Sequence, residues 1–155
     1  MRQDMHIGTA SCHFTLRSAA LIIKDGCLLA VKHDNYDCYY TIGGGVEINE
    51  STADAVLREI YEETGVRANI DRLVYVQERF YETCNKKHHE ITFFYLIESA
   101  NFFLSNGACT DHTTEHMYWL PIQELTKYPL VPEFLHTALC DIPQTLQHVI
   151  SRETA

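Results

Sequence analysis

Several acidic side chains and an arginine follow a run of three glycines within one short stretch of the chain. Glycines 43–45 precede Glu50, and residues 58–63 then read Arg-Glu-Ile-Tyr-Glu-Glu. Hard divalent cations such as Mg²⁺ bind carboxylate and carbonyl oxygens, and they need few protein ligands because substrate phosphates complete their coordination shell. Glycines allow the backbone to approach such a ligand closely. These residue types together are typical of a divalent-metal site for a phosphate compound.

A helix is expected to carry these acids. Ser51 can cap its first turn, Asp54 completes a capping box, and Gly65 can end it in the left-handed conformation. We therefore predict a helix over residues 52–64. Its core-facing stripe is expected to contain Ala53, Val56, Leu57, Ile60 and Thr64.

The acids form one face of this predicted helix. Glu59 lies three and four positions before Glu62 and Glu63, so three like charges are neighbours and destabilise a bare helix. Arg58, four positions before Glu62, offsets one of them. A solvated acidic face is the common explanation for such a run of charges, and a bound cation is the alternative.

The full spacing favours the cation. Gly44, five residues, Glu50, seven residues and then residues 58–66 match every position of the Nudix box, including the apolar positions Ile60 and Val66. The chain therefore resembles the MutT-like Nudix hydrolases, and "EHMYWLPIQEL" is similar to a segment common in them. The resemblance implies an α/β (α+β) Nudix fold, with a mixed β-sheet sandwiched between α-helices. It also implies hydrolysis of a nucleoside diphosphate linked to another group.

The resemblance also assigns roles to residues. Glu59, Glu62 and Glu63 match the family's metal-binding and catalytic glutamates, and the Gly43 carbonyl matches a frequent metal ligand. The implied cofactor is Mg²⁺ or Mn²⁺, which neutralises phosphate charge and activates water. Arg58 is expected to orient a glutamate, and Glu50 to act as an outer or additional ligand. The general base is either the first helix glutamate or a later carboxylate, of which Glu115 is the first candidate and Glu90 the second.

Substrate contacts are expected from glycines and aromatic side chains. Gly44 and Gly45 are placed for close backbone approach, and His88 and His89 are candidates for phosphate contacts. Aromatic rings can stack on a nucleobase, although each is more often used in packing. The aromatic candidates are Tyr39, Tyr40, Phe80, Tyr81 and Trp119.

The substrate itself stays open at this stage. We expect first a (d)NTP or an oxidised (d)NTP, cleaved to the nucleoside monophosphate and pyrophosphate. ADP-ribose, a nucleotide sugar or a dinucleoside polyphosphate comes second. A Nudix-fold sensor that binds a nucleotide without turnover is a different class, but it would be expected to lack box glutamates.

A zinc site is a third alternative. Cys109, His112 and His116 have spacings compatible with zinc ligands, and Cys84 is a candidate fourth ligand. The segment lacks a paired C-x-x-C motif, so a structural zinc site is not favoured.

Composition limits the partners. The chain has 155 residues and a formal net charge of -9, which disfavours a nucleic-acid polymer as ligand because no broad cationic surface is available. The apolar run 19–23 is too short to span a membrane. The six scattered cysteines are expected to be reduced thiols of a cytoplasmic protein. We expect a single domain over residues 1–155 that binds a small-molecule nucleotide, and a homodimer stays open.

The remaining pattern is that of a mixed α/β chain. Asp25-Gly26 predicts a hairpin, residues 73–81, 91–98 and 116–121 read as strands, and 99–115 as a loop. Residues 121–125 predict a helical turn. Residues 132–150 predict one or two helices, with Pro143 able to start the second.

Overall fold

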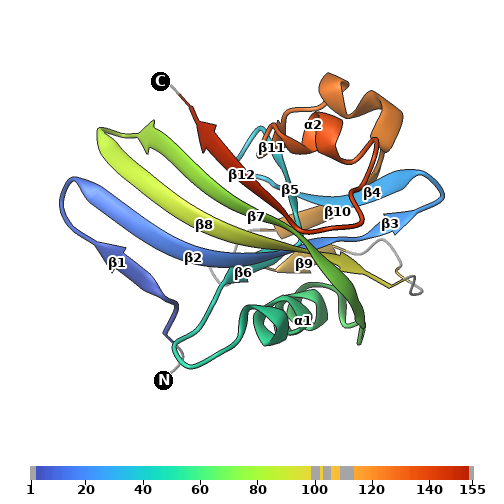
Figure 1. Cartoon of the computed structure of the whole chain (residues 1–155), viewed down its shortest axis with the longest axis horizontal. Helices are drawn as coiled ribbons and strands as arrows, with labels where there is room; N and C mark the ends of the chain where they lie inside the picture. Colours follow the sequence, from blue (N-terminus) through green and yellow to red (C-terminus); the bar gives the residue numbers. More distant parts are fainter. Residues whose placement is uncertain (1–2, 99–101, 103–105, 109–113, 154–155) are drawn as a thin grey trace.

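The described residues form two β-sheets and three helical segments. The computed structural model describes residues 3–98, 102, 106–108 and 114–153. One sheet has the order β1-β2-β8-β7-β12, with β6 also paired to β2, and the other has the order β11-β5-β4-β10-β9, with β3 also paired to β4. Helix α1 lies on one side of the strands, and α2 lies on the other (Figure 1). The predicted α/β sandwich is confirmed, although two mixed sheets replace the single sheet expected.

The elements have the following bounds. The first sheet contains β1 (His6–Gly8), β2 (Cys12–Leu21), β6 (Gly43–Gly45), β7 (Ile70–Thr83), β8 (Lys86–Ile97) and β12 (Gln147–Arg152). The second contains β3 (Ile23–Lys24), β4 (Cys27–His33), β5 (Tyr39–Thr41), β9 (Asn106–Ala108), β10 (Thr114–Pro121) and β11 (Leu130–Val131). The helical segments are α1 (Thr52–Thr64), the 3-10 helix η1 (Ile122–Lys127) and α2 (Leu135–Ala138).

Two tight turns fix the strand registers. Asp25 and Gly26 both have positive φ, 51° and 74°, as a two-residue hairpin turn requires, and Ile23 pairs with Leu28 beside them. The predicted hairpin is confirmed. The same geometry recurs at Cys84 and Asn85, with φ of 50° and 61°, between the long strands β7 and β8.

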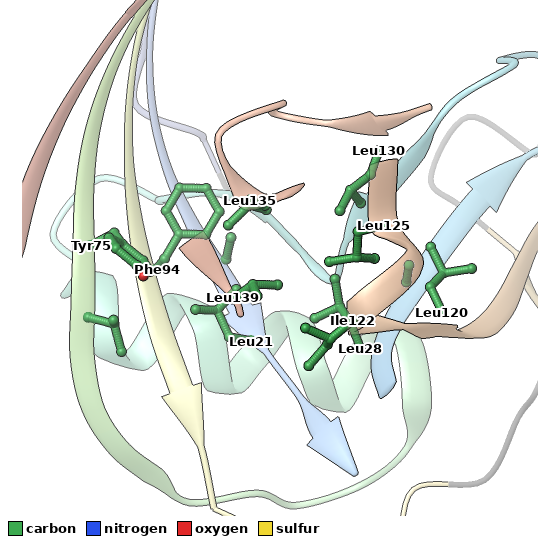
Figure 2. Packing of buried hydrophobic residues seen from close by; sticks show 13 residues of the cluster. Leu21, Leu28, Tyr75, Phe94, Leu120, Ile122, Leu125, Leu130, Leu135 and Leu139 are labelled. Atoms are coloured by element: carbon green, nitrogen blue, oxygen red, sulfur yellow. The ribbon is translucent and has the colours of Figure 1, made fainter. Parts of the chain in front are cut away.

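The alternation of β2 divides the apolar core into two clusters. Ala19 and Leu21 pack into one cluster with η1 and α2 residues such as Leu125 and Leu135 (Figure 2). Ala20 and Ile22 point the other way and pack with α1 residues in the second cluster. Successive side chains of a strand point to opposite faces, so the helices on both sides are held against this one strand.

Helix α1 forms as its sequence predicts. The Ser51 Oγ accepts a hydrogen bond from the Asp54 backbone N–H at 3.0 Å, and Gly65 ends the helix with φ 72°. Ala55, Val56 and Ile60 are its buried residues, and Ala53 and Leu57 pack against the second core cluster. The caps and the apolar stripe together fix which side of the helix presents its acids.

The C-terminal prediction is wrong in part. Residues 132–150 contain only the short helix α2, and no second helix starts at Pro143. Instead Gln147–Arg152 forms β12, parallel to residues 75–80 of β7. Residues 106–108 form β9 within the segment predicted as a loop. Strand β12 depends on pairing with a strand far away in sequence, whereas β9 pairs with the nearby strand β10. Within the described ranges, no helix is long and apolar enough to cross a membrane.

Candidate active site

The glycine strand β6 brings the backbone close to the helix acids. It pairs with β2, so that Gly43 lies opposite Ala19 and Gly45 opposite Arg17. Gly43 has φ 149°, and a Cβ there would collide with the Ser18 carbonyl. A Cβ on Gly44 would lie 2.5 Å from the Glu59 Oε1. Position 43 therefore requires glycine because backbone atoms occupy the space of a side chain, whereas a side chain at position 44 would displace the Glu59 carboxylate.

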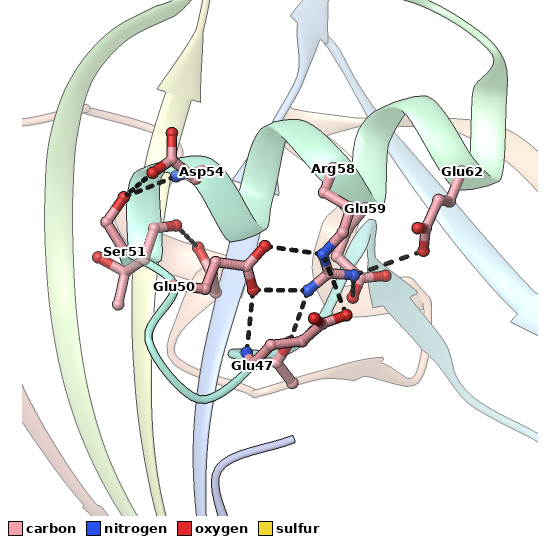
Figure 3. Close-up of polar contacts among 10 residues, drawn as sticks. Glu47, Glu50, Ser51, Asp54, Arg58, Glu59 and Glu62 are labelled. Atoms are coloured by element: carbon pink, nitrogen blue, oxygen red, sulfur yellow. Dashed lines mark hydrogen bonds and ion pairs between the residues drawn. The ribbon is translucent and has the colours of Figure 1, made fainter. Parts of the chain in front are cut away.

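Arg58 connects the helix to the glycine strand and the loop after it (Figure 3). Its Nε and Nη2 donate to the two Glu50 oxygens at 2.8 and 2.9 Å, and Nη2 also donates to the Gly45 carbonyl at 3.0 Å. Nη1 donates to Glu59 Oε1 at 2.6 Å and to Glu62 Oε2 at 3.4 Å. These contacts raise the pKa of Arg58, led by the hydrogen bonds to Glu50. The guanidinium thus holds Glu59 in place, as the predicted orienting role requires.

Glu50 acts within this network. Its Oε2 also accepts the Glu47 backbone N–H at 2.9 Å, so the carboxylate joins the loop before α1 to Arg58. A bidentate pair of this kind fixes geometry as well as charge. Glu50 is therefore placed to support the site through Arg58.

Glu63 is the least satisfied carboxylate of the site. Its Oε1 accepts the Gly43 backbone N–H at 3.2 Å, but its Oε2 is buried without a hydrogen-bond partner among the described residues. Burial raises the pKa of Glu63 well above the usual value, and the negative charge of Glu115 raises it further. A buried, unpaired carboxylate oxygen is costly unless a proton or a cation compensates it.

Glu115 and His33 face each other across the second sheet. The two residues are register partners in β10 and β4, and the His33 Nε2 lies 3.0 Å from the Glu115 Oε1. Glu115 is buried and lines the same cavity as Glu63. The fold thus brings the predicted later carboxylate beside the helix glutamate.

Glu59 and Glu62 differ in their surroundings. Burial raises the pKa of Glu59, whereas the hydrogen bond from Arg58 acts in the opposite direction. The side chain of Glu62 is 39% exposed and has the longer contact to Arg58. Glu59 is consequently fixed against Gly44, and Glu62 lies at the solvent side of the cluster.

A cavity of about 670 Å³ adjoins these carboxylates. Gly43, Glu63 and Glu115 line one part of it, and Tyr40, Tyr81 and Glu90 also line it. Its size is in the range of small-molecule pockets. The fold therefore joins the predicted acids to a space large enough for a nucleotide.

The two predicted aromatic contacts in this cavity are not equivalent. The Cys38 thiol donates to the Tyr40 hydroxyl at 2.7 Å, and burial raises the pKa of Tyr40, helped by this hydrogen bond. The Tyr81 ring stacks on His88 with centroids 4.5 Å apart, and the Arg79 guanidinium lies 4.3 Å from its centroid. Tyr40 also packs against the second core cluster, so both rings already contact protein groups.

Other predicted contacts lie elsewhere. Trp119 packs against the second core cluster and is not among the residues that line the cavity. His89 stacks on Phe80, with ring centroids 4.3 Å apart, and Tyr39 contacts Tyr118 and Tyr128. Packing within the protein accounts for these rings without a substrate.

The zinc alternative gains no support. Cys109 and His112 lie outside the described residues. The His116 Nε2 lies 2.9 Å from the Asp34 Oδ1, and Cys84 is exposed at the turn after β7. Across the described part of the chain, no group of three or more His, Cys, Asp or Glu side chains already has the arrangement of a metal site.

The acidic site nevertheless fits a hard cation by its chemistry. The buried Oε2 of Glu63 lacks a partner among the residues described, and Glu59 lies against the Gly44 backbone. Carboxylate and carbonyl oxygens are the donors that Mg²⁺ and Mn²⁺ prefer. Glu59, Glu62, Glu63 and the Gly43 carbonyl are the groups that would hold such an ion, after local adjustment of the Arg58–Glu59 pair.

Three residues that line the cavity were not predicted from the sequence. Arg17, His33 and Arg79 all line the cavity, although each lies in a strand remote from the box. A charged residue within an otherwise apolar β-strand, as in "FTLRSAAL", is the signal that could have indicated Arg17. The position of His33 depends on the β4–β10 register, which the sequence alone does not reveal.

Comparison with known proteins agrees with this fold. The family model described as "NUDIX domain" matches residues 14–138. The chain therefore belongs to the NUDIX domain family, whose hydrolases generally use divalent metal ions. It is 38% identical over 88 residues to a Lactococcus lactis protein named "Probable DHNTP pyrophosphohydrolase", covering 54% of this chain and 53% of that protein. It is 27% identical over 118 residues to the Escherichia coli "CTP pyrophosphohydrolase", covering 74% and 81%.

The chain spans about half the length of the first curated relatives that it matches, at 47% and 53% of those proteins. Among solved structures, it is similar to a MutT protein from Bacillus halodurans, with a TM-score of 0.63 and 15% identity. That match covers 88% of this chain and 89% of the other. At this level of identity, the likeness confirms the Nudix fold alone.

Proposed function

We propose that the protein hydrolyses a phosphoanhydride bond in a nucleoside diphosphate linked to another group, with Mg²⁺ or Mn²⁺ as cofactor. The observation that carries the proposal is the buried, unpartnered Oε2 of Glu63 in the described site, beside Glu115 and next to a nucleotide-sized cavity. A carboxylate held in this way is suited to a cation and to an anionic ligand brought by that cation.

The chemistry divides between the cofactor and the chain. A bound divalent ion supplies charge neutralisation for the phosphates and a lowered pKa for water. Glu59, Glu62 and Glu63 would hold the ion, and Arg58 keeps Glu59 in position. Glu115, oriented by His33 at 3.0 Å, takes the proton from the attacking water. The cavity orients the nucleoside.

Glu115 is a better candidate base than Glu90 because of strand register. Gly43, which bonds to Glu63, lies opposite Ala19, and Ala19 lies opposite Phe94. Glu90 lies four residues from Phe94 along β8, or about 13 Å at the usual rise of a strand. Glu90 is therefore displaced toward the part of the cavity lined by its register partner Arg79 and by Tyr81, which we assign as the nucleoside end.

A (d)NTP, cleaved to the nucleoside monophosphate and pyrophosphate, is the substrate class that we propose first. The names of two relatives support it, because one is a CTP pyrophosphohydrolase and the other a probable DHNTP pyrophosphohydrolase. Solved structures of similar fold include a UDP-X diphosphatase and an ADP-ribose pyrophosphatase. ADP-ribose, nucleotide sugars, dinucleoside polyphosphates and oxidised (d)NTPs therefore belong in the same screen.

The test is a product-resolved screen of the purified protein with Mg²⁺ and with Mn²⁺. Chromatography of the nucleotide products and an assay for pyrophosphate separate cleavage after the α-phosphate from stepwise phosphate release. We expect turnover of at least one triphosphate and its loss in Glu63→Gln. Nucleotide binding without turnover of any compound would instead support a sensor, although all the box glutamates are present here.

A further inference from the structure

We propose that Arg17 is a substrate-binding residue that grips a phosphate of the nucleotide on the nucleoside side of Glu63. The inference rests on the proposed function only in taking a nucleotide as the ligand. It assigns a role to a cationic side chain that lies outside the Nudix box.

Strand register places Arg17 between the acids and the nucleoside end. Arg17 lies opposite Gly45 on β6 and opposite Thr92 on β8, two residues along β2 from Ala19, the partner of Gly43. Two residues span about 7 Å and return the side chain to the same face. Arg17 lines the same cavity as Glu63 and Glu90.

The guanidinium of Arg17 has only a long ion-pair contact with the described residues. Its one contact with a described residue is to Glu90, where the Nε lies 4.0 Å from the Oε2, and its side chain is 40% exposed. A separation of 4.0 Å is too long for a hydrogen bond. The planar fork of arginine donors is thus open to a phosphate, which it can bind through two hydrogen bonds.

Arg79, the other arginine of the cavity, is already engaged. Its Nε and Nη2 donate to the two Glu153 oxygens at 2.6 and 2.7 Å, and it stacks on Tyr81. Its remaining donors are less available because the group is fixed by these contacts. Of the two arginines, Arg17 is therefore the one that the described residues hold only through a long ion pair, to Glu90 at 4.0 Å.

The charge of the cavity makes such a residue necessary. Acids that line it include Glu63, Glu82, Glu90 and Glu115, and they repel a phosphate chain. A cation at the helix glutamates would neutralise phosphate there, but about 7 Å of strand separates Arg17 from the Gly43 level. The positive charge of Arg17 also opposes the rise that burial causes in the pKa of Glu63, which agrees with its nearness to the site.

Glu90 is the resting partner of Arg17. Its Oε1 accepts a weak hydrogen bond from the Thr92 hydroxyl at 3.3 Å, and its Oε2 faces the guanidinium at the longer distance. A phosphate would compete with this loose contact at little cost, because a long ion pair to a partly exposed arginine is weak. The pair keeps the guanidinium over the cavity in the free protein.

The test measures binding without turnover. In EDTA, wild-type protein is titrated by calorimetry with CTP and GTP and with cytidine and guanosine. We expect at least one triphosphate to bind more tightly than its nucleoside, and Arg17→Ala to weaken that triphosphate by about 10- to 100-fold. Nucleoside affinity should change by less than about twofold. Arg17→Lys should keep part of the difference, because it retains the charge but not the fork.

Arg67→Ala is the matched control, because Arg67 is exposed and contacts Tyr61 away from the cavity. It removes the same charge and should leave binding unchanged. Equal losses in the two variants, an unchanged triphosphate affinity in Arg17→Ala, or no triphosphate binding to the wild type would each overturn the assignment.

Turnover with Mg²⁺ separates this inference from the proposed function. Arg17→Ala should raise KM more than it lowers kcat if the phosphate is held in the ground state. If the wild type hydrolyses the substrate and Arg17→Ala has the same KM and kcat, the role of Arg17 is refuted and the proposed function stays intact. Arg17-dependent binding without wild-type hydrolysis would refute the proposed function and leave the role of Arg17 intact.

Discussion

Arg58 on α1 and Arg17 on β2 both lie beside Gly45 of the glycine strand but have contrasting surroundings. Arg58 donates to Glu50, Glu59 and the Gly45 carbonyl at 2.6 to 3.0 Å, and its side chain is 17% exposed. Arg17 has one loose contact, at 4.0 Å. A cation whose donors are filled by the protein fixes structure, whereas one with unused donors in a cavity is available to a ligand.

The carboxylates show the same contrast. Both oxygens of Glu50 accept hydrogen bonds from Arg58, but the Oε2 of Glu63 has no partner within the described residues. The network around Arg58 therefore stabilises the loop and helix. The unpaired Oε2 of Glu63 and the loosely held Arg17 line the cavity, where a cation and a phosphate would compensate their charges.

The largest expected effect comes from removing Arg58, whose hydrogen-bond donors are engaged by protein oxygens. Arg58→Ala should lower the free energy of unfolding by about 3 kcal/mol, because it leaves partly buried carboxylates without their counter-charge. Arg17→Ala should change it by less than about 1 kcal/mol, as for a weak surface pair. Urea denaturation of both variants measures the two changes. Similar losses of unfolding free energy in the two variants would contradict the contrast between Arg58 and Arg17.

Glu115 and Glu90 offer a second comparison, between the two candidate bases. Glu115→Gln should lower kcat by about 100-fold or more, as expected for loss of a general base. Glu90→Gln should change kcat by less than about threefold, because strand register places it about 13 Å from the Gly43 level. Steady-state kinetics on the best substrate decide this, and a larger kcat loss in Glu90→Gln would reverse the assignment.

The metal-free protein should be stabilised by removing the buried charge of Glu63. Its pKa is raised above the usual 4.5, so above pH 4.5 the folded state binds more proton than the unfolded state. Stability at this site therefore falls as the pH rises. In EDTA at pH 8, Glu63→Gln should raise the free energy of unfolding by about 1 to 3 kcal/mol, and the gain should shrink toward pH 4.5.

Thermal unfolding in EDTA across this pH range measures the effect. Glu124→Gln serves as control, because Glu124 lies on η1 and pairs with Lys127 at 2.9 Å. A pH-independent gain in Glu63→Gln, or a loss, would contradict the buried-charge explanation.

The smallest effect is expected at the start of α1. Ser51→Ala removes the hydroxyl that accepts the Asp54 N–H at 3.0 Å, and should cost about 1 kcal/mol of stability. Ser51→Asp should restore most of it, because the carboxylate can accept the same bond. Activity should survive both changes, so urea denaturation with a parallel assay checks the prediction. A loss of activity with unchanged stability would place Ser51 in the site instead.

Local signals account for what the sequence predicted well. Ser51 and Gly65 mark the two ends of α1, and Asp25-Gly26 marks a hairpin, because caps and tight turns depend on a few adjacent residues. The box glutamates follow from the same short segment. Elements of this kind require no knowledge of distant strands.

The features that the sequence did not predict depend on contacts between strands that are distant in the chain. Strand β12 forms by pairing with β7, more than seventy residues earlier in the chain, so Pro143 suggested a helix that does not form. His33 meets Glu115, and Arg17 lies beside the glycine strand, only because of strand registers. Trp119, predicted as a substrate contact, packs on the core instead. A charged residue within a strand could indicate Arg17, but the sequence contains no local signal for the partner of His33 or for the packing of Trp119.

Hydrolysis by the wild type and by Glu63→Gln is the measurement that tests the central claim most directly. With Mg²⁺ or Mn²⁺ and the substrate that the screen selects, kcat/KM should fall by about 10²- to 10⁴-fold in the variant, and EDTA should abolish wild-type turnover. Glu124→Gln should match the wild type. Wild-type turnover that resists EDTA and persists in Glu63→Gln would contradict a metal-dependent site at this glutamate.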